Sequence, residues 1–180
     1  MNVVAMALGC LLASCTQKPK EPDVAQLLAD LASADPERSG RASLTIVAKG
    51  ELAVPGLIEM LGSPDAKLRA RAATTLWGLG PDARGALGAL TQALRDSDVD
   101  VRRAAATALG DIGPSAAPAV PGLIGALKDS DMAVRHLAAK ALGAIGPPAR
   151  AALPALDETA RLEGLRQAAE DARRRIQGGQ

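Results

Sequence analysis

Residues 98–113 read DVDVRRAAATALGDIG, and this stretch decides the fold because its pattern returns every 33 residues along the chain. In the next copy the apolar residues are four, four and three residues apart: Val134, Ala138, Leu142 and Ile145. This spacing is typical of one buried face of a helix. Asp131 offers an N-cap at its start, and Gly146-Pro147 ends it, because glycine accepts left-handed backbone and proline stops the helix.

The 33-residue period predicts an array of helix pairs over residues 23–157, in rows 53–85, 86–118 and 119–151, a weaker row 23–52 and a partial row from 152. Leucines that coincide between rows are Leu61, Leu94 and Leu127, then Leu76, Leu109 and Leu142. Each row has a short helix such as 119–127, where Pro121 is acceptable because it falls in the first turn. A longer second helix follows it.

The composition favours the same all-α class. The chain of 180 residues has 48% hydrophobic residues but no Phe, no Tyr and one Trp, so its core consists of small and aliphatic side chains. Such side chains suit closely packed helices better than a sandwich or barrel. A net charge of +1 gives no electrostatic drive toward nucleic acid, which we do not expect as a partner.

The pattern Asp-x-x-Val-Arg-x-x-Ala-Ala-x-x-Leu-Gly-x-Ile-Gly, met throughout residues 98–113, resembles the HEAT-repeat family, specifically its short phycobilisome-lyase type. The resemblance implies a right-handed α-solenoid. It also implies a protein-binding scaffold, since few such repeats act in enzymes. It further implies a structural ladder between neighbouring repeats, whose members would be Asp65, Asp98, Asp131, Arg69, Arg102 and Arg135.

The first 22 residues form a separate segment. An apolar run over 3–12 has the length of a signal-peptide core and is too short to span a membrane. It ends in Leu12-Ala13-Ser14-Cys15, which resembles the lipobox of bacterial lipoproteins. This resemblance implies a signal peptide over 1–14, a lipid on Cys15 and a tether over 15–22. No Lys or Arg precedes the apolar run, which departs from the usual signal-peptide pattern. The alternative to a signal peptide is a buried N-terminal helix.

Few residues suggest chemistry. His136 is the only histidine, which excludes a site with several histidine ligands. Asp96, Asp98 and Asp100 imitate the start of a calcium loop, but Val101 stands where that loop needs glycine and Thr107 where it needs glutamate. We therefore expect no metal, no cofactor, no small-molecule substrate and no enzymatic activity.

A candidate binding surface comes from the second helix of each row, which the resemblance places on the concave side of the stack. At about 100° per residue, one set of positions in these helices faces away from the core. That set is Ala70, Thr74 and Trp77, then Arg103, Thr107 and Gly110, then His136, Lys140 and Gly143. Aromatic and cationic residues here would suit an acidic or amphipathic protein segment. The alternative is that Trp77 packs near Val47.

Residues 158–180 are expected to form a charged capping helix and tail, since terminal repeats need a polar outer face. The sequence as a whole predicts a membrane-anchored interaction scaffold of the bacterial envelope. Thr16 after the cysteine resembles sorting to the periplasmic side of a Gram-negative outer membrane, and a cytoplasmic location follows if the N-terminal segment is no signal. Two other roles stay open: a lyase-like partner subunit of an enzyme system and a purely structural envelope assembly factor.

Overall fold

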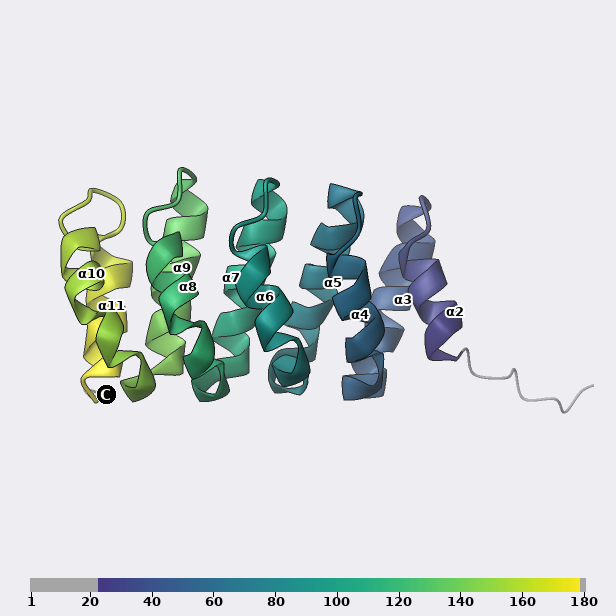
Figure 1. Ribbon diagram of the computed structural model, residues 1–180, viewed down its shortest axis with the longest axis horizontal. Helices are drawn as coiled ribbons and strands as arrows, with labels where there is room; N and C mark the ends of the chain where they lie inside the picture. The colour runs from purple at the N-terminus through teal and green to yellow at the C-terminus, as the bar shows by residue number, and fades with distance from the viewer. Residues whose placement is uncertain (1–22, 179–180) are drawn as a thin grey trace, which may run out of the picture.

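The computed structural model describes residues 23–178, which consist of helices and turns without a strand. The helices form five antiparallel pairs that stand side by side in one row (Figure 1). The first helices of the pairs are α2 (Val24–Leu31), α4 (Val54–Leu61), α6 (Leu87–Ala93), α8 (Val120–Ala126) and α10 (Leu153–Thr159). The second helices are α3 (Pro36–Lys49), α5 (Ala66–Leu79), α7 (Val99–Ile112), α9 (Met132–Ile145) and α11 (Arg166–Ile176). The predicted α-solenoid is confirmed.

Aspartates fix where four of the second helices begin. The side chains of Asp35, Asp65, Asp98 and Asp131 each accept a hydrogen bond from a backbone N–H in the first turn of the helix that follows. Such caps satisfy donors that have no partner inside the helix. At the other end of α9, Gly146 has a φ of 72°, which only glycine adopts without strain. The predicted start and stop signals are therefore confirmed.

The connections between pairs are short 3₁₀ helices that the sequence analysis did not assign. They are η1 (Gly50–Ala53), η2 (Gly80–Ala86), η3 (Gly113–Ala119) and η4 (Pro147–Ala152). In η3 the buried side chains are Ala116 and Ala119, three residues apart, which matches the three residues per turn of this helix. These small residues let successive pairs approach closely.

The core is a continuous strip of leucine and alanine between the two layers of helices. Leucines at equivalent positions of four first helices are fully buried: Leu57, Leu90, Leu123 and Leu156. Opposite them, Leu76, Leu109 and Leu142 of the second helices are also fully buried. Because each pair buries its apolar face against its neighbours, the array is stabilised as a unit.

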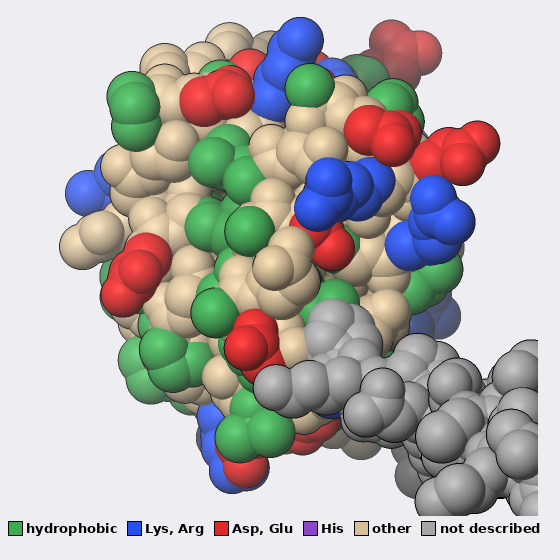
Figure 2. All heavy atoms as spheres, turned by 90° about the vertical axis from the view of Figure 1, so that its right-hand side faces the viewer, with side chains coloured by type: hydrophobic (Ala, Val, Ile, Leu, Met, Phe, Trp, Pro, Cys, Tyr) green, Lys and Arg blue, Asp and Glu red, His purple; other side chains and the backbone are tan. Residues whose placement is uncertain are grey.

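The charged C-terminal segment completes the fifth pair. Helix α11 packs against α9 in the way that α9 packs against α7, and its Ala169 and Ile176 are fully buried. Helix α10 extends to Thr159, one residue past the expected start of the capping segment. At the opposite end, acidic and basic side chains are scattered over the face formed by α2 and α3 (Figure 2). Charged ends fit the polar outer faces that terminal repeats need.

The predicted signal peptide, the lipidated Cys15 and the tether over 15–22 lie outside the described residues. Across residues 23–178, every helix falls short of the length and hydropathy needed to cross a bilayer.

Candidate binding surface on the second helices

The outward row of the second helices forms one continuous surface, which we call the second-helix face. Its members are Gly40, Leu44 and Val47 of α3, Ala70, Thr74 and Trp77 of α5, Arg103, Thr107 and Gly110 of α7, His136 and Lys140 of α9, and Gln167, Asp171 and Arg175 of α11. Thr74, Trp77, His136 and Lys140 are exposed, as predicted, and Thr107 is half-buried. The Thr107 hydroxyl donates to the carbonyl of Arg103 at 2.8 Å, so it serves its own helix.

The N-terminal half of the second-helix face is apolar. Leu44 is 75% exposed, and beside it a pocket of about 310 Å³ opens between α3 and α5. Gly40, Ala70 and Thr74 line this pocket, and a side chain at Gly40 would meet nothing within 4 Å. Leu44 was not predicted as part of this surface because its row lies three residues out of register with the others.

Trp77 links α5 to α7. Its indole Nε1 donates a hydrogen bond to Oδ2 of Asp111 at 2.6 Å, and the residue remains 43% exposed. Val47 lies against Gly78, the residue after Trp77, where an added Cβ would come within 2.9 Å of it. The indole is therefore anchored at its polar end and presents its apolar ring at the surface, an arrangement that suits a binding contact.

Arg103 is not the free cation that the sequence suggested. Its Nε and NH2 donate to Oδ1 and Oδ2 of Asp131 at 3.0 and 2.7 Å, and NH1 donates to Asp100 at 3.3 Å. Asp131 caps α9 and therefore sits beside α7, within reach of the guanidinium. The pair is half-exposed. Arg103 thus joins neighbouring repeats, and its charge is already compensated.

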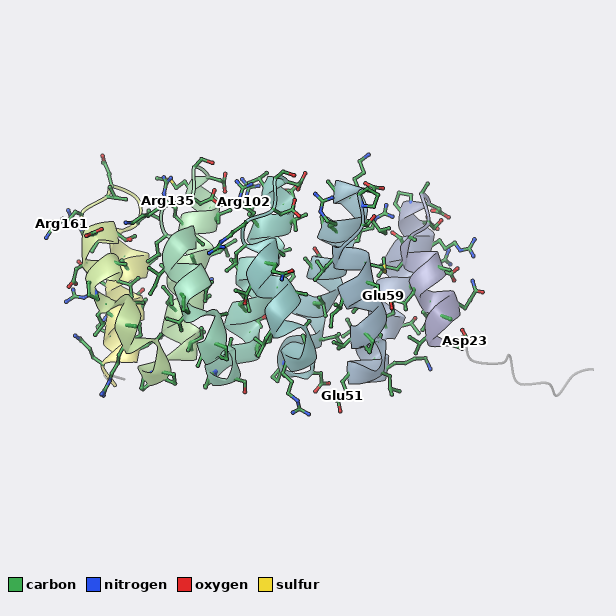
Figure 3. The ribbon with its side chains drawn as sticks, in the orientation of Figure 1. Asp23, Glu51, Glu59, Arg102, Arg135 and Arg161 are labelled. Atoms are coloured by element: carbon green, nitrogen blue, oxygen red, sulfur yellow. The ribbon has the colours of Figure 1, made fainter. Side chains whose placement is uncertain are left out.

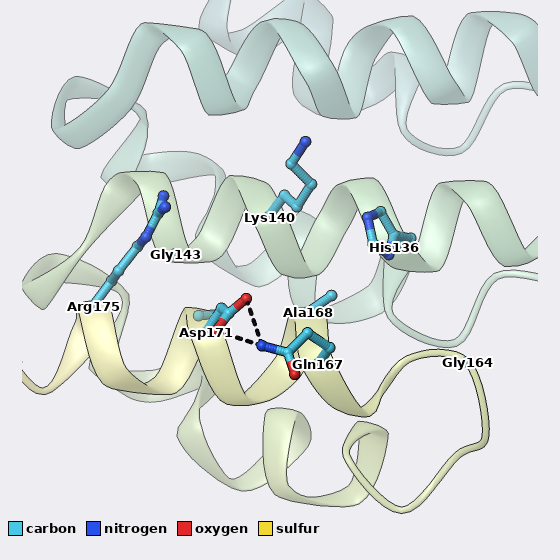
Figure 4. A pocket seen from close by; sticks show the side chains of 9 residues that line it. His136, Lys140, Gly143, Gly164, Gln167, Ala168, Asp171 and Arg175 are labelled. Carbon is cyan, nitrogen blue, oxygen red and sulfur yellow. Dashed lines mark hydrogen bonds between the residues drawn. The ribbon is translucent and has the colours of Figure 1, made fainter.

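The C-terminal half of the second-helix face holds a polar pocket of about 250 Å³ between α9 and α11. His136, Lys140, Gln167, Asp171 and Arg175 line it (Figure 4). The pKa of Asp171 lies below its usual range because Gln167 and the neighbouring Arg174 donate hydrogen bonds to it. With its one carboxylate engaged in this way, the pocket is cationic.

Gly143 is buried and not part of the exposed surface that we predicted. An added Cβ would come within 2.9 Å of Cα of Ala172, because α11 packs directly over this position. A Cβ added at Gly110 would likewise come within 3.2 Å of Cα of Ala141 in α9. Glycine at these positions therefore permits close packing of α7, α9 and α11. At the equivalent position α5 has Trp77, which leans across α7 instead.

The polar ladder exists, but its acids differ from those predicted. Arg69 donates from Nε and NH2 to Asp96 at 2.7 Å each, and Arg102 donates to Asp129 at 2.8 and 3.0 Å. The NH1 groups of both arginines bind backbone carbonyls at the start of their own helices. Asp65, Asp98 and Asp131 cap their helices, and Asp131 also pairs with Arg103 rather than with a ladder arginine. Arg102 and Arg135 lie along the edge where the loops inside each pair gather (Figure 3).

Hydrogen bonds between repeats lower the pKa values of Asp96, Asp129 and Asp131. The Arg69 hydrogen bonds hold the pKa of Asp96 below its usual range. Burial alone would raise the pKa of Asp129, but hydrogen bonds from Arg102 and the Asp131 backbone N–H outweigh it and the pKa falls. Arg103 and the Val134 backbone N–H bring the pKa of Asp131 from 3.8 to about 2.

Stability is expected to fall as the pH drops from about 4 to about 2. Because the folded pKa of Asp131 is about 2 and its ordinary value is 3.8, the unfolded chain binds more protons in this window. Thermal unfolding midpoints measured across this range should decrease with pH, and they should change little between pH 5 and 7. Asp131→Asn should lower the midpoint at neutral pH and flatten the acid slope. A wild-type midpoint that is constant down to pH 2 would contradict the account.

The second-helix face combines apolar, aromatic and cationic features. Residues 23–178 contain no group of three or more His, Cys, Asp or Glu side chains placed to hold a metal ion. Its features are an apolar pocket, an anchored indole and a cationic pocket, arranged in that order along the stack. An extended chain could contact all three in turn.

Comparison with known proteins agrees with this geometry. The family model described as HEAT repeats matches residues 54–120 and 89–174, which together cover more than half of the chain. The chain belongs to the HEAT-repeat family. No curated protein is similar enough in sequence to match it.

Solved structures show the same fold in other HEAT and armadillo proteins. The complex of CpcE and CpcF of phycocyanin lyase from Nostoc sp. PCC7120 has a chain with a TM-score of 0.71 and 23% identity, covering 83% of this HEAT-repeat chain and 97% of that one. A computationally designed armadillo repeat protein for modular peptide recognition has a TM-score of 0.64 and 18% identity, and the match covers 87% of this chain and 82% of that one. The archaeal HEAT-like repeats protein from Thermococcus onnurineus NA1 has a TM-score of 0.59 and 18% identity, and the match covers 85% of this chain and 63% of that one. At these identities the likeness establishes the fold alone.

Proposed function

We propose that this HEAT-repeat protein is a non-catalytic scaffold that binds an extended segment of a partner protein along its second-helix face. The observation that carries the proposal is the change from apolar to cationic side chains along that face. Leu44 and Trp77 expose apolar surface at one end, whereas His136, Lys140 and Arg175 gather at the other. Residues that recur in every repeat are explained by the architecture. The apolar and cationic residues just named do not recur, so the architecture does not explain them.

The proposed partner segment carries apolar side chains at one end and acidic side chains at the other. Trp77 is suited to be its main anchor because a half-exposed indole buries a large apolar area on binding at little entropic cost. The cationic pocket around Lys140 would set the direction of the segment, since charge complementarity contributes most to specificity. In support of this mode, the designed armadillo proteins with a similar fold recognise peptides.

We further propose that a lipid on Cys15 holds the scaffold at a membrane of the bacterial envelope. The lipobox-like residues before Cys15 and the polar, proline-containing segment after it support this part of the proposal. At about 3.3 Å per extended residue, the seven residues 16–22 would reach roughly 20 Å from the bilayer. The anchored scaffold would then meet a partner near that membrane.

A second candidate is a partner subunit of an enzyme system. The observation that favours it is the shared fold with the chains of phycocyanin lyase, whose CpcE and CpcF form a complex. A pigment or substrate that copurifies with this chain would support the second candidate over the scaffold. A purely structural role in envelope assembly is the third candidate, and it would tolerate changes to the second-helix face.

Replacing both anchors should abolish partner capture. Trp77→Ala with Lys140→Glu removes the apolar contact and reverses the charge, and we expect at least a tenfold loss of a crosslinked partner from native membranes. Lys140 is preferred to Arg103 because Arg103 already bonds Asp131, and its loss would disturb the fold.

The matched control is Leu52→Ala with Lys67→Glu, which changes exposed residues outside the second-helix face. The control should capture the partner as wild type does, and both variants should keep wild-type helicity by circular dichroism. Equal capture by the folded anchor variant would refute the assignment of this face. Failure of wild type to capture any protein would favour the structural role.

A further inference from the structure

The ladder has an incomplete rung at Arg135. This arginine follows Arg69 and Arg102 at the 33-residue period and is held in the same way, since its NH1 donates to the carbonyls of Asp129 and Ser130 at 2.7 and 3.3 Å. Its Nε, however, is buried without a hydrogen-bond partner, and no carboxylate among residues 23–178 pairs with the guanidinium. In the two preceding repeats the equivalent guanidinium donates two hydrogen bonds, from Nε and NH2, to an aspartate.

The missing partner can be located by register. Asp96 and Asp129 each lie 27 residues after the arginine that they bind, and the residue 27 positions after Arg135 is Leu162. In each case the first helix of the pair ends three residues earlier. The N–H of Leu162 donates to the carbonyl three residues earlier at 3.0 Å, as the N–H groups of Asp96 and Asp129 do at 3.1 and 3.2 Å. Leucine therefore occupies the place of the acid.

The space around Arg135 is open. A pocket of about 430 Å³ is lined by Leu127, Lys128, Arg135, Ala155, Glu158, Thr159 and Leu162. Leu162 is 48% exposed, so it is not fixed in the core. Lys128 adds a second cation to the wall. Glu158 lies on the same wall but forms no ion pair with Arg135 among the described residues.

We propose that this pocket, which we call the Arg135 site, binds a carboxylate group from outside the chain. The carboxylate accepts hydrogen bonds from Nε and NH2 of Arg135, as Asp96 and Asp129 accept them from Arg69 and Arg102. A guanidinium already oriented by two backbone carbonyls loses little freedom on binding, and its planar fork matches a carboxylate through two parallel hydrogen bonds. The apolar wall of Leu127, Ala155 and Leu162 favours a carboxylate with carbon attached. The site lies at the loop edge and is independent of the second-helix face.

Arginine side-chain NMR tests the Arg135 site directly on the full chain. Sodium acetate should shift the Nε–H signal of Arg135 in a saturable way and leave the signal of Arg102 in place, whereas sodium chloride at equal ionic strength should shift neither. A capped tetrapeptide with one aspartate, compared with its asparagine counterpart, identifies the source. Tighter binding of the aspartate peptide than of acetate indicates a protein side chain, and equal binding indicates a free carboxylate.

Leu162→Asp supplies the missing acid and separates the proposal from a purely structural role. The variant should complete the rung, raise the unfolding midpoint by about 2–4 °C and abolish the acetate shift at Arg135. Arg135→Lys, whose ammonium cannot donate two parallel hydrogen bonds to a carboxylate, should bind the aspartate peptide no more tightly than its asparagine counterpart. Absence of an acetate shift in wild type overturns the proposal. An acetate shift that appears in Glu158→Gln but not in wild type also overturns the proposal, because the Glu158 carboxylate then pairs with Arg135 in wild type.

Discussion

Leu109→Ala is expected to lower the free energy of unfolding by about 3 kcal/mol, one of the two largest effects anticipated for any single change. Leu109 lies in the central second helix, is fully buried and packs between the pairs on either side. Alanine would remove apolar area and leave a cavity that α5 and α9 can fill only in part. Urea denaturation followed by circular dichroism at 222 nm measures the loss.

Leu44→Ala is the matched control for this prediction. It makes the same chemical change in the middle of another second helix, but Leu44 is 75% exposed. Its effect should stay within about 0.5 kcal/mol, since exposed substitutions away from special features change stability little. Similar losses for the two variants would mean that the leucines at the Leu109 position do not form the core of the stack.

Gly143→Ala should destabilise the fold by about 1–3 kcal/mol even though alanine is the better helix former. The new Cβ would come within 2.9 Å of the Ala172 backbone, so α11 would have to move away from α9. Amide hydrogen exchange should show lost protection first in α11, because the terminal pair has only one neighbour.

Gly40→Ala separates packing from helix propensity. Gly40 also lies inside a second helix of 14 residues, but a Cβ there meets nothing within 4 Å. Alanine should therefore stabilise the protein by about 0.5–1 kcal/mol. Stabilisation by both substitutions would show that α9 and α11 are not in close backbone contact.

The repeat could be predicted from the sequence because it depends on local signals that recur. Aspartate caps, glycine stops and the three- and four-residue spacing of apolar side chains specify each helix without knowledge of its neighbours. Thr74, Trp77, His136 and Lys140 were predicted to be exposed by the same helical geometry, and the structure confirms this.

The contacts between repeats could not be predicted in this way. Arg103 was expected to be free because nothing within its own helix signals that the cap of the next helix lies beside it. The choice of Asp98 over Asp96 as the ladder acid failed for the same reason. Asp96 and Asp129 do recur at the 33-residue period, so a search for acids 27 residues after each arginine could have found them. Gly143 was expected to be exposed because the packing of α11 was not foreseen.

Site-specific photo-crosslinking in native membranes shows whether a partner segment lies along the second-helix face. p-Benzoylphenylalanine would replace Thr74 on α5 or Gln167 on α11, and, as controls, exposed Gly88 or Gln92 on the first helix α6. We expect positions 74 and 167 to crosslink to the same protein and positions 88 and 92 not to crosslink to it. Crosslinks to that protein from α6 alone, or equally from all four positions, would contradict this expectation.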